Sequence, residues 1–163
     1  MLKHVLVPLD GSHLAYKALD FATHIVDSKC IISLLTVVQK PEIPLYSITS
    51  MATLNAEYSD INVIYNDAKR YLAGEGALLI QQGFVVTLHV ERGDPAHTIV
   101  HIANEIDVDA IIMSTHGRSG LNRWIFGSVT GKVLSMAPRP VFVVPSYEMQ
   151  KRFEHELSHV NVG

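Results

Sequence analysis

The sequence lacks three features that would assign a class at once. Its single cysteine, Cys30, excludes a disulfide within the chain. No apolar run reaches the length of a membrane-spanning helix, and the segment before the first apolar run is too short for a signal peptide. With 13 Lys and Arg against 16 Asp and Glu, the chain has no strong field for nucleic acid or an anionic membrane. These absences favour a cytoplasmic protein that binds any anion at a local site.

Length and composition indicate one globular domain with a buried core. Of the 163 residues, 48% are hydrophobic and 18% charged, which argues against a disordered chain. Apolar segments typical of strands alternate with segments of helical periodicity, a pattern that favours a parallel sheet with helices on both faces. We expect strands over residues 3–9, 30–38, 84–90, 109–114 and 140–144, and helices over residues 13–27, 53–82, 96–105 and 128–136.

Capping and turn residues mark the ends of several of these segments. Ser12 is a good N-cap for the first helix, and Pro95 suits the first turn of the third helix. Gly74 and Gly76 weaken the long second helix, and Gly83 is a natural stop after it. Local chemistry therefore predicts several of the element ends.

The most informative stretch joins the fourth strand to the last helix, over residues 114–128 (STHGRSGLNRWIFGS). It holds two glycine turns, at Gly117 and Gly127, and such connections of a parallel sheet present main-chain N–H groups to anions. Glycine allows a close approach because it has no Cβ, and Ser128 adds a hydroxyl at the positive end of a helix. Loop glycines also form turns that bind nothing, so both interpretations stay open at this point.

Asp10 follows the first expected strand, in an Asp-Gly-Ser turn. Ligands of open parallel sheets bind at the carboxyl ends of the strands, near the point where the strand order reverses. If the first and fourth strands are neighbours there, Asp10 and the Gly117 turn face one crevice. Asp10 could otherwise be only a turn former, and it is the crevice position that favours a binding role.

These residues resemble the nucleotide-binding branch of the universal stress protein family. That branch carries Gly-x-x-Gly, nine residues, and then Gly-Ser or Gly-Thr between its fourth strand and last helix. Gly117, the nine residues 118–126 and Gly127 match this spacing, whereas Ser114 stands in place of the first glycine. The resemblance covers about residues 2–145. Further matching segments are Val-Pro-Leu-Asp-Gly-Ser at 7–12, Leu-Thr-Val at 35–37, Gly-Asp-Pro at 93–95, and residues 140–144.

The resemblance implies a Rossmann-like α/β domain, similar to the adenine nucleotide alpha hydrolases, over residues 1–145. Its five-stranded parallel sheet would have the order 3-2-1-4-5, and residues 146–163 would form a C-terminal extension. The resemblance also implies a homodimer that pairs through the last strand, Val141 to Val144. An adenine nucleotide, ATP with Mg²⁺, would lie across the carboxyl ends of the first and fourth strands.

Ligand residues follow from the resemblance position by position. It places Asp10 at the adenosine moiety and Val37, through its backbone, at the adenine edge. To these we add Arg118 and Arg123, either as cations within reach of a triphosphate or, in the alternative interpretation, as solvated loop charges. The expected phosphate ligands are the main-chain amides of Gly117, Gly127, Ser128 and Val129. The complete expected set is Pro8, Leu9, Asp10, Val37, Ser114, His116, Gly117, Arg118, Arg123, Gly127, Ser128 and Val129.

Three functions are compatible with this pattern. The first is a regulatory module whose state depends on ATP, and the second is a slow ATP hydrolase, slow because no base is evident to activate water. The third is a dimeric scaffold whose crevice is empty. The sequence His-Glu-Leu-Ser-His at 155–159 matches a zinc-protease motif, but its polar context favours coincidence. We therefore expect neither a catalytic residue nor a protein metal site.

Overall fold

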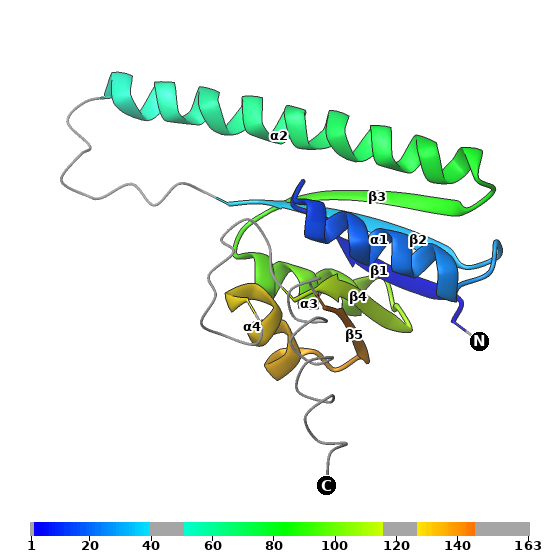
Figure 1. Ribbon diagram of the computed structural model, residues 1–163. Coiled ribbons are helices and arrows are strands. Elements are labelled where there is room, and N and C mark those ends of the chain that lie inside the picture. Colours follow the sequence, from blue (N-terminus) through cyan, green and yellow to red (C-terminus); the bar gives the residue numbers. More distant parts are fainter. Residues whose placement is uncertain (1, 40–50, 116–126, 146–163) are drawn as a thin grey trace, which may run out of the picture.

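The computed structural model describes residues 2–39, 51–115 and 127–145, with the backbone alone for residues 51–60. Within these ranges every expected strand and helix is present, with ends within two residues of the prediction. Figure 1 shows their arrangement. The elements are β1 (His4–Pro8), α1 (His13–Ile25), β2 (Ile31–Val38), α2 (Met51–Gln81), β3 (Val85–Arg92), α3 (Pro95–Glu105), β4 (Ala110–Ser114), α4 (Ser128–Met136) and β5 (Val141–Val144).

The five strands form one parallel sheet in the order β3-β2-β1-β4-β5, which confirms the predicted fold class. β1 lies at the centre, with Pro8 opposite Leu35 of β2 and Leu6 opposite Ile111 of β4. β2 continues three residues past that pair, to Val38. The strand order therefore reverses at β1, between β2 and β4.

Helices cover both faces of the sheet because successive strand residues point to opposite sides. This double burial explains why the central strands read as continuous apolar runs and not as alternating ones. The core facing α1 and α2 includes Val5, Val7, Ile32, Leu34, Leu72 and Ile112. The core facing α3 and α4 includes Leu6, Leu35, Ile99, Ile102, Ile111 and Val133.

α2 is one continuous helix through both of its glycines, and it ends before Gly83, whose φ of +92° explains the stop. A Cβ on Gly76 would lie 2.9 Å from Leu88 Cδ2, whereas Gly74 has no neighbour within 4 Å among the described residues. Gly76 thus allows α2 to approach β3 closely, and Gly74 has no such role. No helix in the described ranges combines the length and apolar character needed to cross a bilayer.

Alanine substitutions should separate the two glycines. Gly74→Ala should raise the free energy of unfolding by about 1 kcal/mol, because alanine favours the helix and meets open space. Gly76→Ala should raise the free energy of unfolding by less, because its methyl group must displace the Leu88 side chain. Urea unfolding of both variants checks this. Equal gains would show that the approach to Leu88 imposes no constraint.

Candidate functional site

The carboxyl ends of β1 and β4 are the natural ligand position of this sheet. From β1 the chain turns to α1 on one face, and from β4 it leads to α4 on the opposite face. The β1–β4 register, with Leu6 opposite Ile111, makes Asp10 level with Thr115 when it is continued. The structure thus places the Asp10 turn and the start of the stretch 114–128 at one edge, as a topological switch point requires.

The turn after β1 is fixed by hydrogen bonds to its own chain and to β2. The Ser12 N–H donates to Asp10 Oδ1 at 2.9 Å, and Ser12 Oγ accepts from the Ala15 N–H at 3.2 Å and caps α1. The predicted cap is therefore confirmed. Gly11, with φ of +78°, supplies the left-handed conformation that the turn needs. One carboxylate oxygen of Asp10 is thus held by the turn, which sets the direction of the side chain.

Leu9 ties the same turn to β2. Its N–H donates to the Leu35 carbonyl at 2.7 Å, and its carbonyl accepts from Thr36 Oγ1 at 3.0 Å. Its side chain is buried in the core beside α1. Pro8 ends β1 opposite Leu35, and Val37 lies next to the last residue of β2, packed on the α3 side. Pro8 and Leu9 therefore hold the edge together, and Val37 lies in the part of β2 that extends past β1.

The start of α4 is attached to the end of β4. The Gly127 N–H donates to the Thr115 carbonyl at 2.5 Å, and Thr130 Oγ1 donates to the Ser114 carbonyl at 2.8 Å. The Thr115 N–H in turn donates to the Val144 carbonyl at 3.1 Å. These bonds hold Thr115 and Gly127 next to each other. They also fix the first turn of α4 at the carboxyl edge.

α4 begins without a capping side chain, because its N-cap is Gly127. The first helical bond joins the Gly131 N–H to the Gly127 carbonyl at 2.9 Å, so the N–H groups of the preceding turn have no intrahelical acceptor. Ser128 is exposed and Val129 is partly buried. These amides carry the positive end of the helix dipole. The arrangement can therefore accept an anion at Ser128 and Val129.

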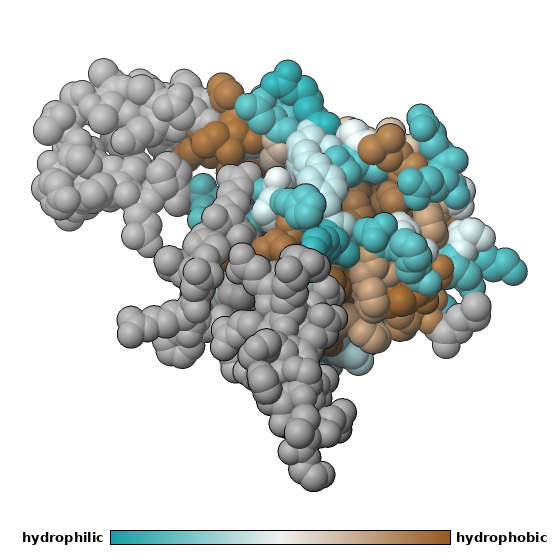
Figure 2. Space-filling view, in the orientation of Figure 1, coloured by the Kyte–Doolittle hydropathy of each residue, from teal (hydrophilic) through white to brown (hydrophobic). Residues whose placement is uncertain are grey.

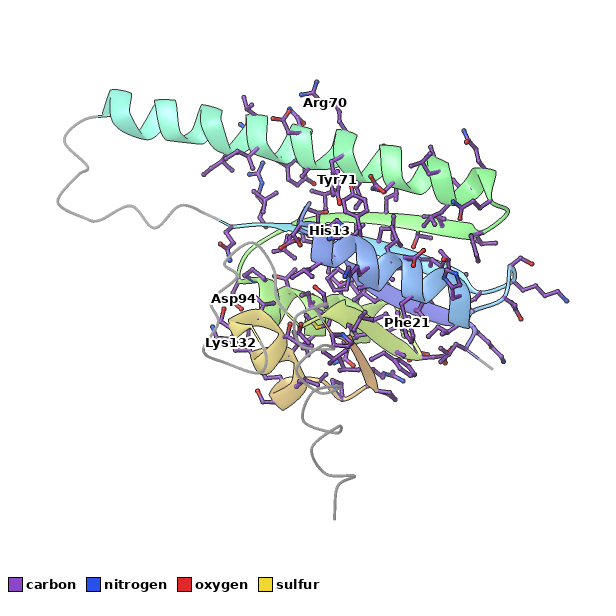
Figure 3. All side chains as sticks on the ribbon, in the orientation of Figure 1. His13, Phe21, Arg70, Tyr71, Asp94 and Lys132 are labelled. Atoms are coloured by element: carbon purple, nitrogen blue, oxygen red, sulfur yellow. The ribbon has the colours of Figure 1, made fainter. Side chains whose placement is uncertain are left out.

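An ion pair lies close to the first turn of α4, between α3 and α4. Asp94 Oδ1 caps α3 by accepting from the His97 N–H at 3.0 Å, and Asp94 Oδ2 lies 3.7 Å from Lys132 Nζ (Figure 3). The bond from the His97 N–H, the contact with the His97 ring and the Lys132 charge lower the pKa of Asp94 below its ordinary value. Sequence reasoning missed this pair. No local pattern signals it, because the pair joins two helices that are distant in sequence.

Four expected ligand residues, His116, Gly117, Arg118 and Arg123, lie outside the described residues, as does the 155–159 motif. The other eight are at or next to the carboxyl edge. Within the described ranges, no group of three or more His, Cys, Asp or Glu side chains could hold a metal ion.

A hollow of about 410 Å³ lies elsewhere, between α2 and β3. β2 separates β3 from β1, so this groove is distinct from the switch point. Tyr65, which lines it, donates from its hydroxyl to the Val90 carbonyl at 3.0 Å, and this bond helps to attach α2 to the edge strand β3. The groove is lined by Tyr65, Lys69, Leu72, Leu88, His89, Val90 and Glu91.

Comparison with known proteins now identifies the family. The model of the universal stress protein family matches residues 1–145. The chain belongs to the universal stress protein family. A universal stress protein of Bacillus subtilis is 29% identical over 147 residues, covering 88% of this chain and 99% of the relative. A universal stress protein of Methanocaldococcus jannaschii is 32% identical over 157 residues, covering 88% and 95%.

Solved structures of universal stress proteins share the fold. The structure of the Methanocaldococcus jannaschii protein matches with a TM-score of 0.78 at 30% identity, covering 88% of this chain and 96% of that one. A universal stress protein in complex with cAMP matches at 20% identity (TM-score 0.55, 88% and 97% covered). One from Arabidopsis thaliana with AMP bound matches at 16% identity (TM-score 0.60, 90% and 94% covered). Because these two proteins are only 20% and 16% identical to the chain, their similarity shows the shared fold alone.

The attachment of α4 can be tested through Thr130. Thr130→Val keeps the shape of this buried side chain but removes the bond to the Ser114 carbonyl, so the free energy of unfolding should fall by about 1 kcal/mol. Ser135→Ala, which removes an exposed bond within α4, should change it by less than about 0.5 kcal/mol. Denaturant unfolding measures both. Equal effects would show that the Thr130 bond does not hold the helix start.

Proposed function

We propose that this universal stress protein is a regulatory module that binds ATP at the carboxyl ends of β1 and β4. One observation carries the proposal. The uncapped first turn of α4 is attached to the end of β4 and lies at the same edge as the Asp10 turn after β1. A helix N-terminus of this kind binds phosphate, and an acidic turn hydrogen-bonds the hydroxyl or amino groups of a nucleoside.

The phosphate end of the proposed site lies at α4. The amides of Ser128 and Val129 receive phosphate oxygens, and Gly127 leaves the approach open because it has no Cβ. Gly117, Arg118 and Arg123 complete this end, and Mg²⁺ accompanies the triphosphate. No carboxylate cage is required of the protein, because Mg²⁺ commonly binds through the phosphates and water.

The nucleoside end of the proposed site lies between β1 and β2. Asp10 contacts the adenosine, and the backbone of Val37 meets the adenine edge. Pro8 and Leu9 hold this wall through their bonds and register with β2. Ser114 and His116 border the ligand from the β4 side. The bound AMP and cAMP of two structural relatives support an adenine nucleotide, and ATP is the finer proposal.

A regulatory role is favoured over catalysis because Asp10 Oδ1 is engaged by the Ser12 N–H, which suits a binding group better than a general base. The nucleotide that remains with the purified protein separates the alternatives. Denaturing the protein and analysing the supernatant by chromatography should release ATP. ADP with steady phosphate release would indicate a slow hydrolase, and no nucleotide would favour a scaffold.

Two substitutions test the ends of the site, with Mg-ATP affinity measured by calorimetry. Asp10→Ala should weaken binding at least about tenfold, because a hydrogen-bonded carboxylate is lost from the nucleoside end. Asp27→Ala is the matched control, since Asp27 makes a similar turn at the opposite edge and should leave affinity unchanged. An equal loss in both variants would contradict the proposed nucleoside contact.

Gly127→Ala tests the phosphate end. The φ of −60° and ψ of 161° at Gly127 suit any residue, so alanine should fold without backbone strain. Its methyl group should nevertheless obstruct the phosphate and weaken Mg-ATP binding at least about fivefold, as steric exclusion of a close backbone contact predicts. Unchanged affinity, with a circular dichroism spectrum equal to that of the wild type, would show that the phosphate does not bind at this turn.

The same family assignment supports a homodimer through β5. β5 is an edge strand, paired with β4 on one side, and an edge strand is a template for pairing with a second copy. Phe142 is 40% exposed on it, and Phe21 of α1 is 37% exposed. Figure 2 shows hydrophobic surface on the side of the molecule where Figure 1 draws α1 and β5. A two-fold pairing would cover part of this surface.

Light scattering can test the dimer. Phe142→Glu should shift the mass from dimer to monomer, because a carboxylate would be buried at the proposed contact. Ile80→Glu, at a more exposed apolar residue of α2, should leave the mass unchanged. A wild-type protein that is monomeric at high micromolar concentration would overturn this part of the proposal.

A further inference from the structure

Lys132 lies one helical turn after Ser128, on the same side of α4. Its Nζ is 3.7 Å from Asp94 Oδ2, at the start of α3, and Figure 3 shows the two residues facing one another between the helices. The ion pair is open to solvent, with side-chain exposures of 58% for Lys132 and 44% for Asp94. The contact joins two helices that are separate in sequence.

The geometry carries the ammonium group toward the carboxyl edge. Side chains of a helix lean toward its N-terminus, so a long side chain four residues after Ser128 extends back over the first turn of α4. Asp94, the partner of Lys132, lies near the carboxyl end of β2. Its neighbour Gly93 donates its N–H to the carbonyl of Val38, the last residue of β2, at 3.1 Å. The charge of Lys132 is therefore held between the first turns of α3 and α4.

Asp94 makes other contacts besides the one with Lys132. Asp94 Oδ1 accepts from the His97 N–H at 3.0 Å and lies 2.9 Å from His97 Nδ1. A solvent-exposed ion pair contributes little to stability and is screened by salt. Lys132 can therefore leave Asp94 at little cost, while the cap of α3 stays in place.

We propose that Lys132 recognises the distal phosphates of the nucleotide and makes the site select di- and triphosphates over a monophosphate. This inference rests on the proposed nucleotide site. A phosphate chain that starts at the amides of Ser128 and Val129 brings net negative charge, even with Mg²⁺ bound, to an edge where Asp94 is already anionic. Lys132 offsets Asp94 in the ligand-free protein and turns to the phosphate oxygens when the chain is long enough. Asp94 opposes this exchange and so limits the affinity for ATP.

The test compares calorimetric affinities of the full chain for Mg-ATP, Mg-ADP and AMP at one ionic strength. Lys132→Gln should weaken Mg-ATP about tenfold, as expected for one lost charge-assisted hydrogen bond, and AMP less than about twofold. Asp94→Asn should strengthen Mg-ATP about threefold or more, because it frees Lys132, while asparagine still caps α3. Arg139→Gln, which breaks the Arg139–Asp107 pair at the other end of α3, is the matched control and should change none of the affinities.

The outcomes separate the two proposals. A wild-type protein that binds none of the three nucleotides overturns the proposed function and the inference together. If the wild type binds but Lys132→Gln affects ATP and AMP equally, or neither, only the role of Lys132 is overturned. A fall in ATP affinity for Asp94→Asn overturns it as well, since it would show that the carboxylate assists binding.

Discussion

The parallel pairing of β1 with β4 is the constraint on which the site depends. β1 is buried on both faces, with Leu6 in one core and Val7 in the other. A slip of one residue would exchange these faces, so core packing fixes the register. The same register makes Asp10 level with Thr115, and the chain then leaves the two strands toward opposite faces. The core packing that stabilises the sheet therefore also positions the Asp10 turn and the first turn of α4 at one edge.

Much of this fold could be predicted from local chemistry. Doubly buried strands produce short apolar runs, and Ser12, Gly83 and Pro95 mark helix ends by capping, by a left-handed φ and by a missing N–H. The strand order is a different matter, because apolar runs do not encode which strands are neighbours. It followed from the glycine spacing around Gly117 and Gly127, whose likeness to one family brought the order with it, and the structure confirms that order.

The features that sequence reasoning missed depend on contacts between distant segments. Ser33 interrupts an apolar strand and is fully buried, yet its hydroxyl lies 2.6 Å from the His4 ring and 2.6 Å from Thr87 Oγ1, a pairing that exists only once three strands are aligned. The close approach of α2 to β3 at Gly76 likewise requires the packed layers. The Asp94–Lys132 pair joins two helices in the same way. Such interactions can be reasoned about after the topology is known and not before.

The central claim is that the edge formed by β1 and β4 is the nucleotide site, and amide NMR during a titration with Mg-ATP tests it most directly. The account predicts shifts concentrated at that edge, at Gly11, Ser12, Val37, Ser128 and Val129. Amides at the opposite edge, such as Lys29 and Gly83, should stay unchanged. A spectrum that does not change at millimolar Mg-ATP, or one whose changes gather at that opposite edge, would contradict the account.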